Sequence, residues 1–166
     1  MKMIQKTAAA LFAILAAGPA FAAEPREIWF EDLAPKGAPE AQIVDEGEMT
    51  PAEGAWKPQD DADAIRFNEA LDGALVRMPG YIVPMGGGSD GVTSFLLVPY
   101  VGACIHVPAP PANQIVFVAT ETPWPNDSLW DPVWVTGTLK IQPLSTELAE
   151  VGYTMQALAI APYTEQ

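Results

Sequence analysis

The chain has 166 residues, the length of about one domain. It carries 21 acidic and 8 basic residues, so its net charge is −13, and no basic cluster offers a surface for nucleic acid or anionic lipid. One cysteine and one histidine exclude an intramolecular disulfide and a four-ligand zinc site built from Cys and His of a single chain.

Residues 1–22 have the features of a cleaved secretory signal. Lys2 and Lys6 flank the start of an apolar stretch that is too short to span a bilayer, and the segment ends in Ala20-Phe21-Ala22, which fits the rule for signal peptidase. No cysteine stands directly after this cleavage site, so we expect no lipid anchor there. The sequence therefore predicts a protein of the periplasm whose mature chain begins near Ala23.

Acidic residues and prolines concentrate in residues 23–70. We expect this segment to be an extended acidic arm that packs on a separate β domain formed by residues 71–166. The arm has one apolar anchor, residues 28–33, in which Trp29 and Leu33 are four positions apart and can share a helical face. An exposed Trp-Leu pair has no reason to interrupt so polar a segment, so both side chains are predicted to be buried against the domain.

Short apolar runs separated by turn residues predict five or six strands in the β domain. The expected strands cover residues 75–83, 92–98, 103–107, 114–119, 133–141 and 152–160. Gly80 and Gly137 lie between β-branched residues inside two of these strands, where glycine lets a strand bend sharply round a small barrel. The sequence therefore predicts a mainly β fold, an OB-like barrel with short helices, with a β-sandwich as the alternative.

Several motifs resemble one bacterial family. They are Ile28–Pro35, Val76–Pro84, Phe95–Pro108 with its Cys-x-His-x-Pro, Asn113–Val116 and Val133–Leu139. Through these residues the chain resembles the exported family known as domain of unknown function 3299, over nearly the whole mature chain. The resemblance implies an exported domain without a known reaction, and an accessory part of an ABC-type transport system linked to metal supply.

Cys104 and His106 are the candidates for chemistry. In an extended strand, residues at i and i+2 point to the same face with side chains about 7 Å apart, so a thiolate and an imidazole can converge on one ion. This donor pair suits Cu(I) or Zn(II). Two ligands are too few, so the others are expected from a second chain or from Met85, Met155 or Asp90.

Two other roles for Cys104 stay open. A buried cysteine can act as a small hydrophobe, which would make Cys104 and His106 structural. Cys104 can also be the centre of a thiol-dependent redox or catalytic protein. A nucleophilic pair needs the base within hydrogen-bond reach of the sulfur, which alternate strand positions do not provide, and the sequence has no G-x-S-x-G, H-E-x-x-H or Walker motif. The sequence favours a non-enzymatic binding protein that serves a membrane transport complex or another periplasmic protein.

Asn113, Trp124 and Trp130 are candidates for contact with a ligand or partner. The two tryptophans lie in a proline-flanked stretch, residues 124–132, which is expected to be a long loop pinned to the barrel or, alternatively, a docking face for a protein. An OB-like barrel that binds nucleic acid needs basic residues beside its aromatic residues, and only two basic residues follow Arg66. Nucleic acid is therefore not an expected partner.

Overall fold

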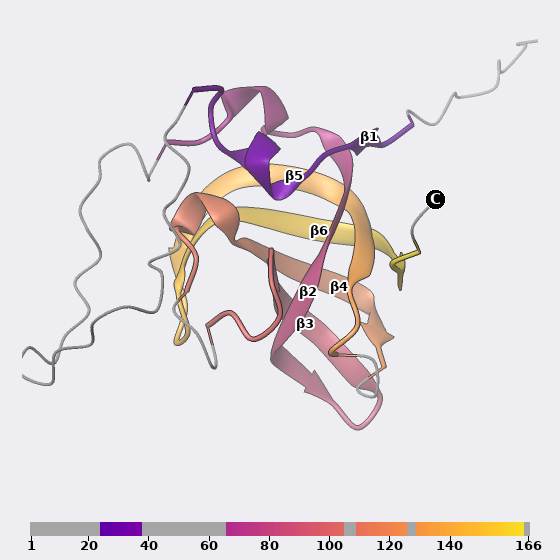
Figure 1. The fold of residues 1–166 in the computed structure, drawn as a ribbon. Helices are drawn as coiled ribbons and strands as arrows, with labels where there is room; N and C mark the ends of the chain where they lie inside the picture. The colour runs from indigo at the N-terminus through magenta and orange to yellow at the C-terminus, as the bar shows by residue number, and fades with distance from the viewer. Residues whose placement is uncertain (1–23, 38–65, 105–108, 126–128, 165–166) are drawn as a thin grey trace, which may run out of the picture.

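The computed structural model describes residues 24–37, 66–104, 109–125 and 129–164, so the predicted signal segment and residues 38–65 of the arm lie outside the described residues. Strands joined by short 3-10 helices make up most of the described chain (Figure 1). In chain order the elements are β1 (Arg26–Glu27), η1 (Phe30–Leu33), η2 (Glu69–Leu71), β2 (Leu75–Gly88), β3 (Gly91–Val98), η3 (Ala112–Gln114), β4 (Val116–Trp124), β5 (Val133–Ser145) and β6 (Glu150–Pro162).

Five of the strands form a closed barrel. Their order is β2-β3-β4-β6-β5, and β5 pairs back with β2 to close the ring. Neighbouring barrel strands are antiparallel except β4 and β6, which run parallel. A parallel pair between the third and fifth strands of a five-stranded closed sheet is the arrangement of an OB barrel. The predicted OB-like barrel is confirmed, and β1 adds a sixth strand parallel to β2.

β2 closes the barrel because it changes partners in its middle. Leu75–Gly80 pair with β5, and the ladder with β3 begins at Tyr81. At the change, a Cβ on Gly80 would lie 2.8 Å from Cγ of Leu97 and 3.0 Å from the carbonyl oxygen of Val98. The strand can therefore pass this close to β3 only without a side chain, as the sequence predicted for this glycine.

Gly137 permits a similarly close approach of two strands where β5 meets β6. A Cβ there would overlap the carbonyl oxygen of Gln156 and lie 2.8 Å from Cγ of Met155. The register of the β5–β6 ladder shifts beside this contact, which leaves Leu158 of β6 without a paired residue on β5. This extra residue is a β-bulge, a feature that bends a strand and re-aims a side chain.

The described part of the arm packs against the barrel. Ile28, Phe30 and Leu33 belong to the hydrophobic core inside it, and Leu33 is fully buried as predicted. The prediction for Trp29 is wrong, because its side chain is 42% exposed. Trp29 precedes η1 and lies on the outside of the barrel, where its ring meets the ring of Trp134 edge-on with centroids 5.9 Å apart.

Tyr153 of β6 fastens both ends of the arm to the barrel. Its fully buried hydroxyl donates a hydrogen bond to the carbonyl of Leu33 (2.6 Å) and accepts one from the backbone N–H of Asn68 (2.8 Å). The Asn68 side chain in turn donates to the carbonyl of Asp32 (2.8 Å), and the ring of Phe67 packs edge-on against the Tyr153 ring at 5.4 Å. One side chain therefore joins two segments that are far apart in the sequence.

Replacing Gly137 with Ala should destabilise the protein by about 1–3 kcal/mol, because the new methyl group overlaps backbone that cannot move independently. Gly88→Ala is the matched control, since a Cβ at Gly88 meets nothing within 4 Å. The free energy of unfolding from urea titration measures both. Equal stability of the two variants would contradict the close approach described for β5 and β6.

Tyr153→Phe should cost about 0.5–1.5 kcal/mol, because it removes both hydrogen bonds of the buried hydroxyl, while the Asn68 N–H and the Leu33 carbonyl remain bonded to each other (3.1 Å). Burial raises the pKa of Tyr153, so the folded state favours the protonated hydroxyl. The free energy of unfolding should therefore fall as the pH rises above the ordinary tyrosine value near 10, and this loss should shrink in Tyr153→Phe. Urea titrations at pH 7 to 11 check this, with Tyr81→Phe as the control.

Candidate functional site

The chain between β3 and β4 covers one outer face of the barrel. Side chains alternate along β3: Phe95 and Leu97 join the core inside the barrel, whereas Leu96 and Val98 join a second hydrophobic cluster. This outer cluster consists of Val83, Leu96, Val98, Ala103, Ile115 and Val151, with partly buried neighbours that include Tyr81, Met85, Tyr100, Cys104 and Phe117. The described residues of this connection thus pack on an outer face to which β2, β3 and β4 contribute, and which includes the second and third barrel strands, where OB folds commonly bind their ligands.

Cys104 lies on a tight turn in this connection and not in a strand. Its φ is +65°, a left-handed conformation, and no other non-glycine residue of the described chain has a positive φ. The expected strand over residues 103–107 is therefore wrong at Cys104, and the argument from alternating strand positions fails there. Gly102, with φ +83°, turns the chain just before it. A left-handed non-glycine residue is uncommon and is often found at a functional site.

The Cys104 thiol is half-buried against the outer cluster. Burial raises its pKa above the ordinary cysteine value, so the protonated thiol is favoured near neutral pH. Burial also raises the pKa of Tyr100, to which the nearby Cys104 thiolate adds a smaller effect. Catalytic and redox-active cysteines have the opposite property, a lowered pKa produced by neighbouring positive charge.

The structure brings one of the predicted additional ligands to the region of Cys104. Met85 of β2 packs against the same outer cluster, whereas Met155 is buried in the core inside the barrel and cannot share a site with Cys104. Asp90 lies in the exposed turn between β2 and β3, where its carboxylate accepts a hydrogen bond from Ser89 (3.2 Å). His106 lies outside the described residues.

Asn113 has a structural function. It is the one buried polar residue among those described, and its side chain donates a hydrogen bond to the carbonyl of Arg66 (3.1 Å). The neighbouring Gln114 donates to the carbonyl of Phe30 (2.9 Å). These two amides connect η3 to both described ends of the arm.

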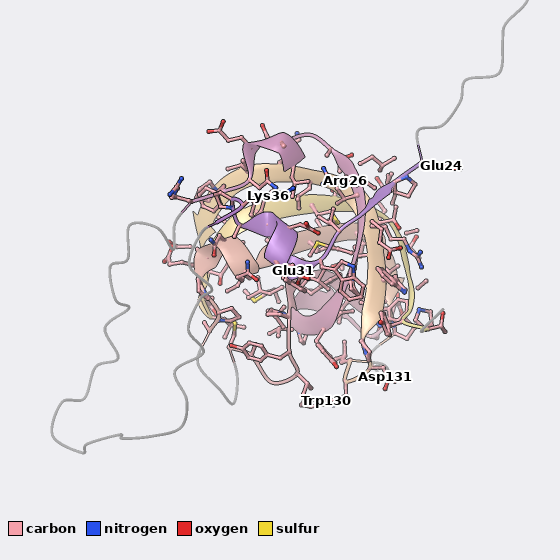
Figure 2. All side chains as sticks on the ribbon, turned by 45° about the horizontal axis from the view of Figure 1, so that its top comes forward. Glu24, Arg26, Glu31, Lys36, Trp130 and Asp131 are labelled. Atoms are coloured by element: carbon pink, nitrogen blue, oxygen red, sulfur yellow. The ribbon has the colours of Figure 1, made fainter. Side chains whose placement is uncertain are left out.

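The two predicted partner-binding tryptophans differ in exposure. Trp124 ends β4 and packs partly against the core inside the barrel. Trp130 is 65% exposed, and Figure 2 shows it beside Asp131 at the edge of the molecule. The sequence did not predict that Trp124 would line a groove between β4 and β6 together with Leu158. Gly137 indicated that β5 bends sharply, but it did not indicate the bulge at Leu158 on the neighbouring strand β6.

Among the described residues, no group of three or more His, Cys, Asp or Glu side chains is arranged to hold a metal ion. The helices in this part of the chain are all too short and too polar to cross a membrane. What the described residues define is a small OB-like barrel with a cysteine-bearing connection packed over one face.

The family of proteins of unknown function DUF3299 has a sequence profile that matches residues 29–162. The chain belongs to this family. Among solved structures it is similar to a DUF3299 family protein from Pseudomonas aeruginosa PAO1, with 41% sequence identity and a TM-score of 0.68, over 87% of this chain and 99% of that one. No curated protein matches the chain. The predicted resemblance is thereby confirmed.

The raised pKa of Cys104 leads to a prediction on its reactivity. Alkylation by iodoacetamide requires the thiolate, so the rate at pH 7 should be well below that of free cysteine and should rise with pH to a midpoint above the ordinary value of about 8.5. Mass spectrometry of timed samples measures the rate. The same protein unfolded in urea is the control and should react as free cysteine does. A midpoint below 8 in the folded protein would contradict the prediction and support a catalytic thiol.

Proposed function

We propose that this chain is an exported accessory protein of a membrane transport system and that it handles a soft transition metal, Cu(I) or Zn(II). The observation that carries the proposal is the placement of Cys104: a left-handed turn holds its thiol in the same outer cluster as the Met85 thioether. His106 follows two residues later in the sequence. Thiolate, thioether and imidazole are the donors that Cu(I) prefers, and Zn(II) accepts the first and the last.

The surroundings of Cys104 favour metal handling over the alternative, a thiol-dependent catalyst. Burial keeps the thiol protonated, which slows nucleophilic attack but still allows a metal to displace the proton. The high negative charge of the chain would raise the local concentration of cations. The signal-like residues 1–22 support export.

Titration of the mature protein, purified from the periplasm, with Cu(I) and with Zn(II) tests the proposal. Cys104→Ala and His106→Ala should each weaken binding of both ions by at least about tenfold, the result of losing one ligand from a small donor set. Met85→Leu should weaken Cu(I) binding and leave Zn(II) binding unchanged, because a thioether is a soft ligand. Affinity should fall as the pH is lowered, since the thiol and imidazole must lose protons.

Met155→Leu is the matched control, because this methionine lies inside the barrel, and it should bind both ions as the wild type does. Weak, salt-sensitive uptake that is equal in all variants would mean nonspecific binding to carboxylates and would contradict the proposal. Stability must be followed in parallel, because loss of a merely structural Cys104 would lower the free energy of unfolding without changing metal affinity.

A further inference from the structure

A groove opens on the barrel where β4 and β6 separate. The parallel ladder between these strands runs from the pair Val116–Tyr153 to the pair Ala119–Gln156 and ends there. Beyond it the two strands enclose a space of about 510 Å³, lined by Thr120–Pro125 and by Gln156–Ile160. The strands leave the shared ladder on the same side of the molecule, to the right in Figure 1.

β4 moves away from β6 because its own pairing is interrupted. Its ladder with β3 pairs Ala119 with Ser94 and resumes only at Trp124, which pairs with Val92. Between these pairs the Thr120 hydroxyl donates to the carbonyl of Thr122 (3.0 Å), a contact within β4 itself. Pro123 has no N–H to give to a neighbouring strand. The local sequence of β4 thus produces the separation.

β6 is an edge strand along the groove. From Ala157 to Pro162 it is paired with β5 on one side, and its ladder on the other side ended at Gln156. An edge of this kind presents backbone N–H and C=O groups to a further strand. At about 3.3 Å per residue, the edge has room for roughly five residues of extended chain.

The side chains around the groove indicate what kind of chain fits it. Trp124 and Ile160 pack on the core inside the barrel and give the groove an apolar floor. The bulge turns Leu158 outward at the rim, where it is 70% exposed. Glu121, which is also exposed, is the one charged residue in the lining.

We propose that this groove binds an extended segment of a partner protein, which adds to the free edge of β6 as a further strand. The segment would alternate apolar side chains, which contact Trp124 and Leu158, with basic side chains, which face Glu121. Backbone hydrogen bonds supply affinity in this mode of recognition, and alternate side chains supply specificity. The site is separate from Cys104, so the inference goes beyond the proposed metal handling and does not depend on it.

The probe is a fluorescein-labelled hexapeptide of alternating valine and lysine, whose binding to the full-length protein is followed by fluorescence anisotropy. Two further peptides have the same sequence and charge but carry N-methyl groups at alternate residues. In one peptide the methyl groups lie along one edge of the extended chain, and in the other they lie along the opposite edge, so each peptide lacks one set of backbone donors. Leu158→Lys should weaken binding of the unmodified peptide by about tenfold, because it removes one apolar side-chain contact and places a positive charge against the lysines of the peptide. At least one of the N-methylated peptides should show an equal loss of affinity for the wild-type protein, relative to the unmodified peptide.

Leu148→Lys is the matched control, because it makes the same charge change at a leucine that is 39% exposed in the turn between β5 and β6, and it should bind the peptide as the wild type does. Both replaced side chains are exposed, so each variant should melt near the wild-type temperature. If all three peptides bound the wild-type protein equally, binding would rest on charge attraction alone, and the proposal would be overturned. The same would follow if Leu158→Lys and Leu148→Lys lost affinity for the unmodified peptide to the same extent. A wild-type dimer in sedimentation that Leu158→Lys dissociates, without peptide binding, would assign the groove to a second copy and also overturn it.

Discussion

Two backbone approaches that only glycine permits determine how tightly this barrel can close. At Gly80 the first barrel strand passes against Leu97 as it exchanges β5 for β3, and at Gly137 β5 meets the carbonyl of Gln156. In a small barrel the strands are packed closely all the way round, so a side chain at either point would push two strands apart and reduce packing in the interior. The β6 bulge lies directly beside the second approach. The bulge shapes the β6 side of the groove, and the interrupted pairing of β4 separates the two strands.

Much of the fold could be predicted from the sequence because local signals and long-range packing agree in the strands. Apolar runs, turn residues and the two interior glycines predicted the strands and the barrel. The prediction failed at Cys104, where a run of small and apolar residues resembles a strand but Gly102 turns the chain and a left-handed residue follows. It also failed at Trp29, because hydrophobicity alone does not say whether a tryptophan lies inside a barrel or on it.

The candidate site was less predictable because it depends on which face of the barrel each side chain occupies. Met85 and Met155 are the same residue type and both lie in strands, yet Met85 packs on the outer cluster and Met155 lies in the interior of the barrel. The outer cluster also takes up the surface that other OB folds use for oligonucleotides or oligosaccharides.

The hydrogen bonds of Tyr153 have a consequence for the order of folding. The groups that hold the arm, the carbonyl of Leu33 and the amide of Asn68, lie near the beginning of the described chain, and their shared partner lies on the last strand. Contacts between residues so far apart in sequence form late, because a long loop must close before they are gained. The arm therefore gains its contacts in stages: Arg26 and Glu27 can pair with β2 as soon as that strand forms, and the bonds of Leu33 and Asn68 to Tyr153 are completed only when the last strand docks.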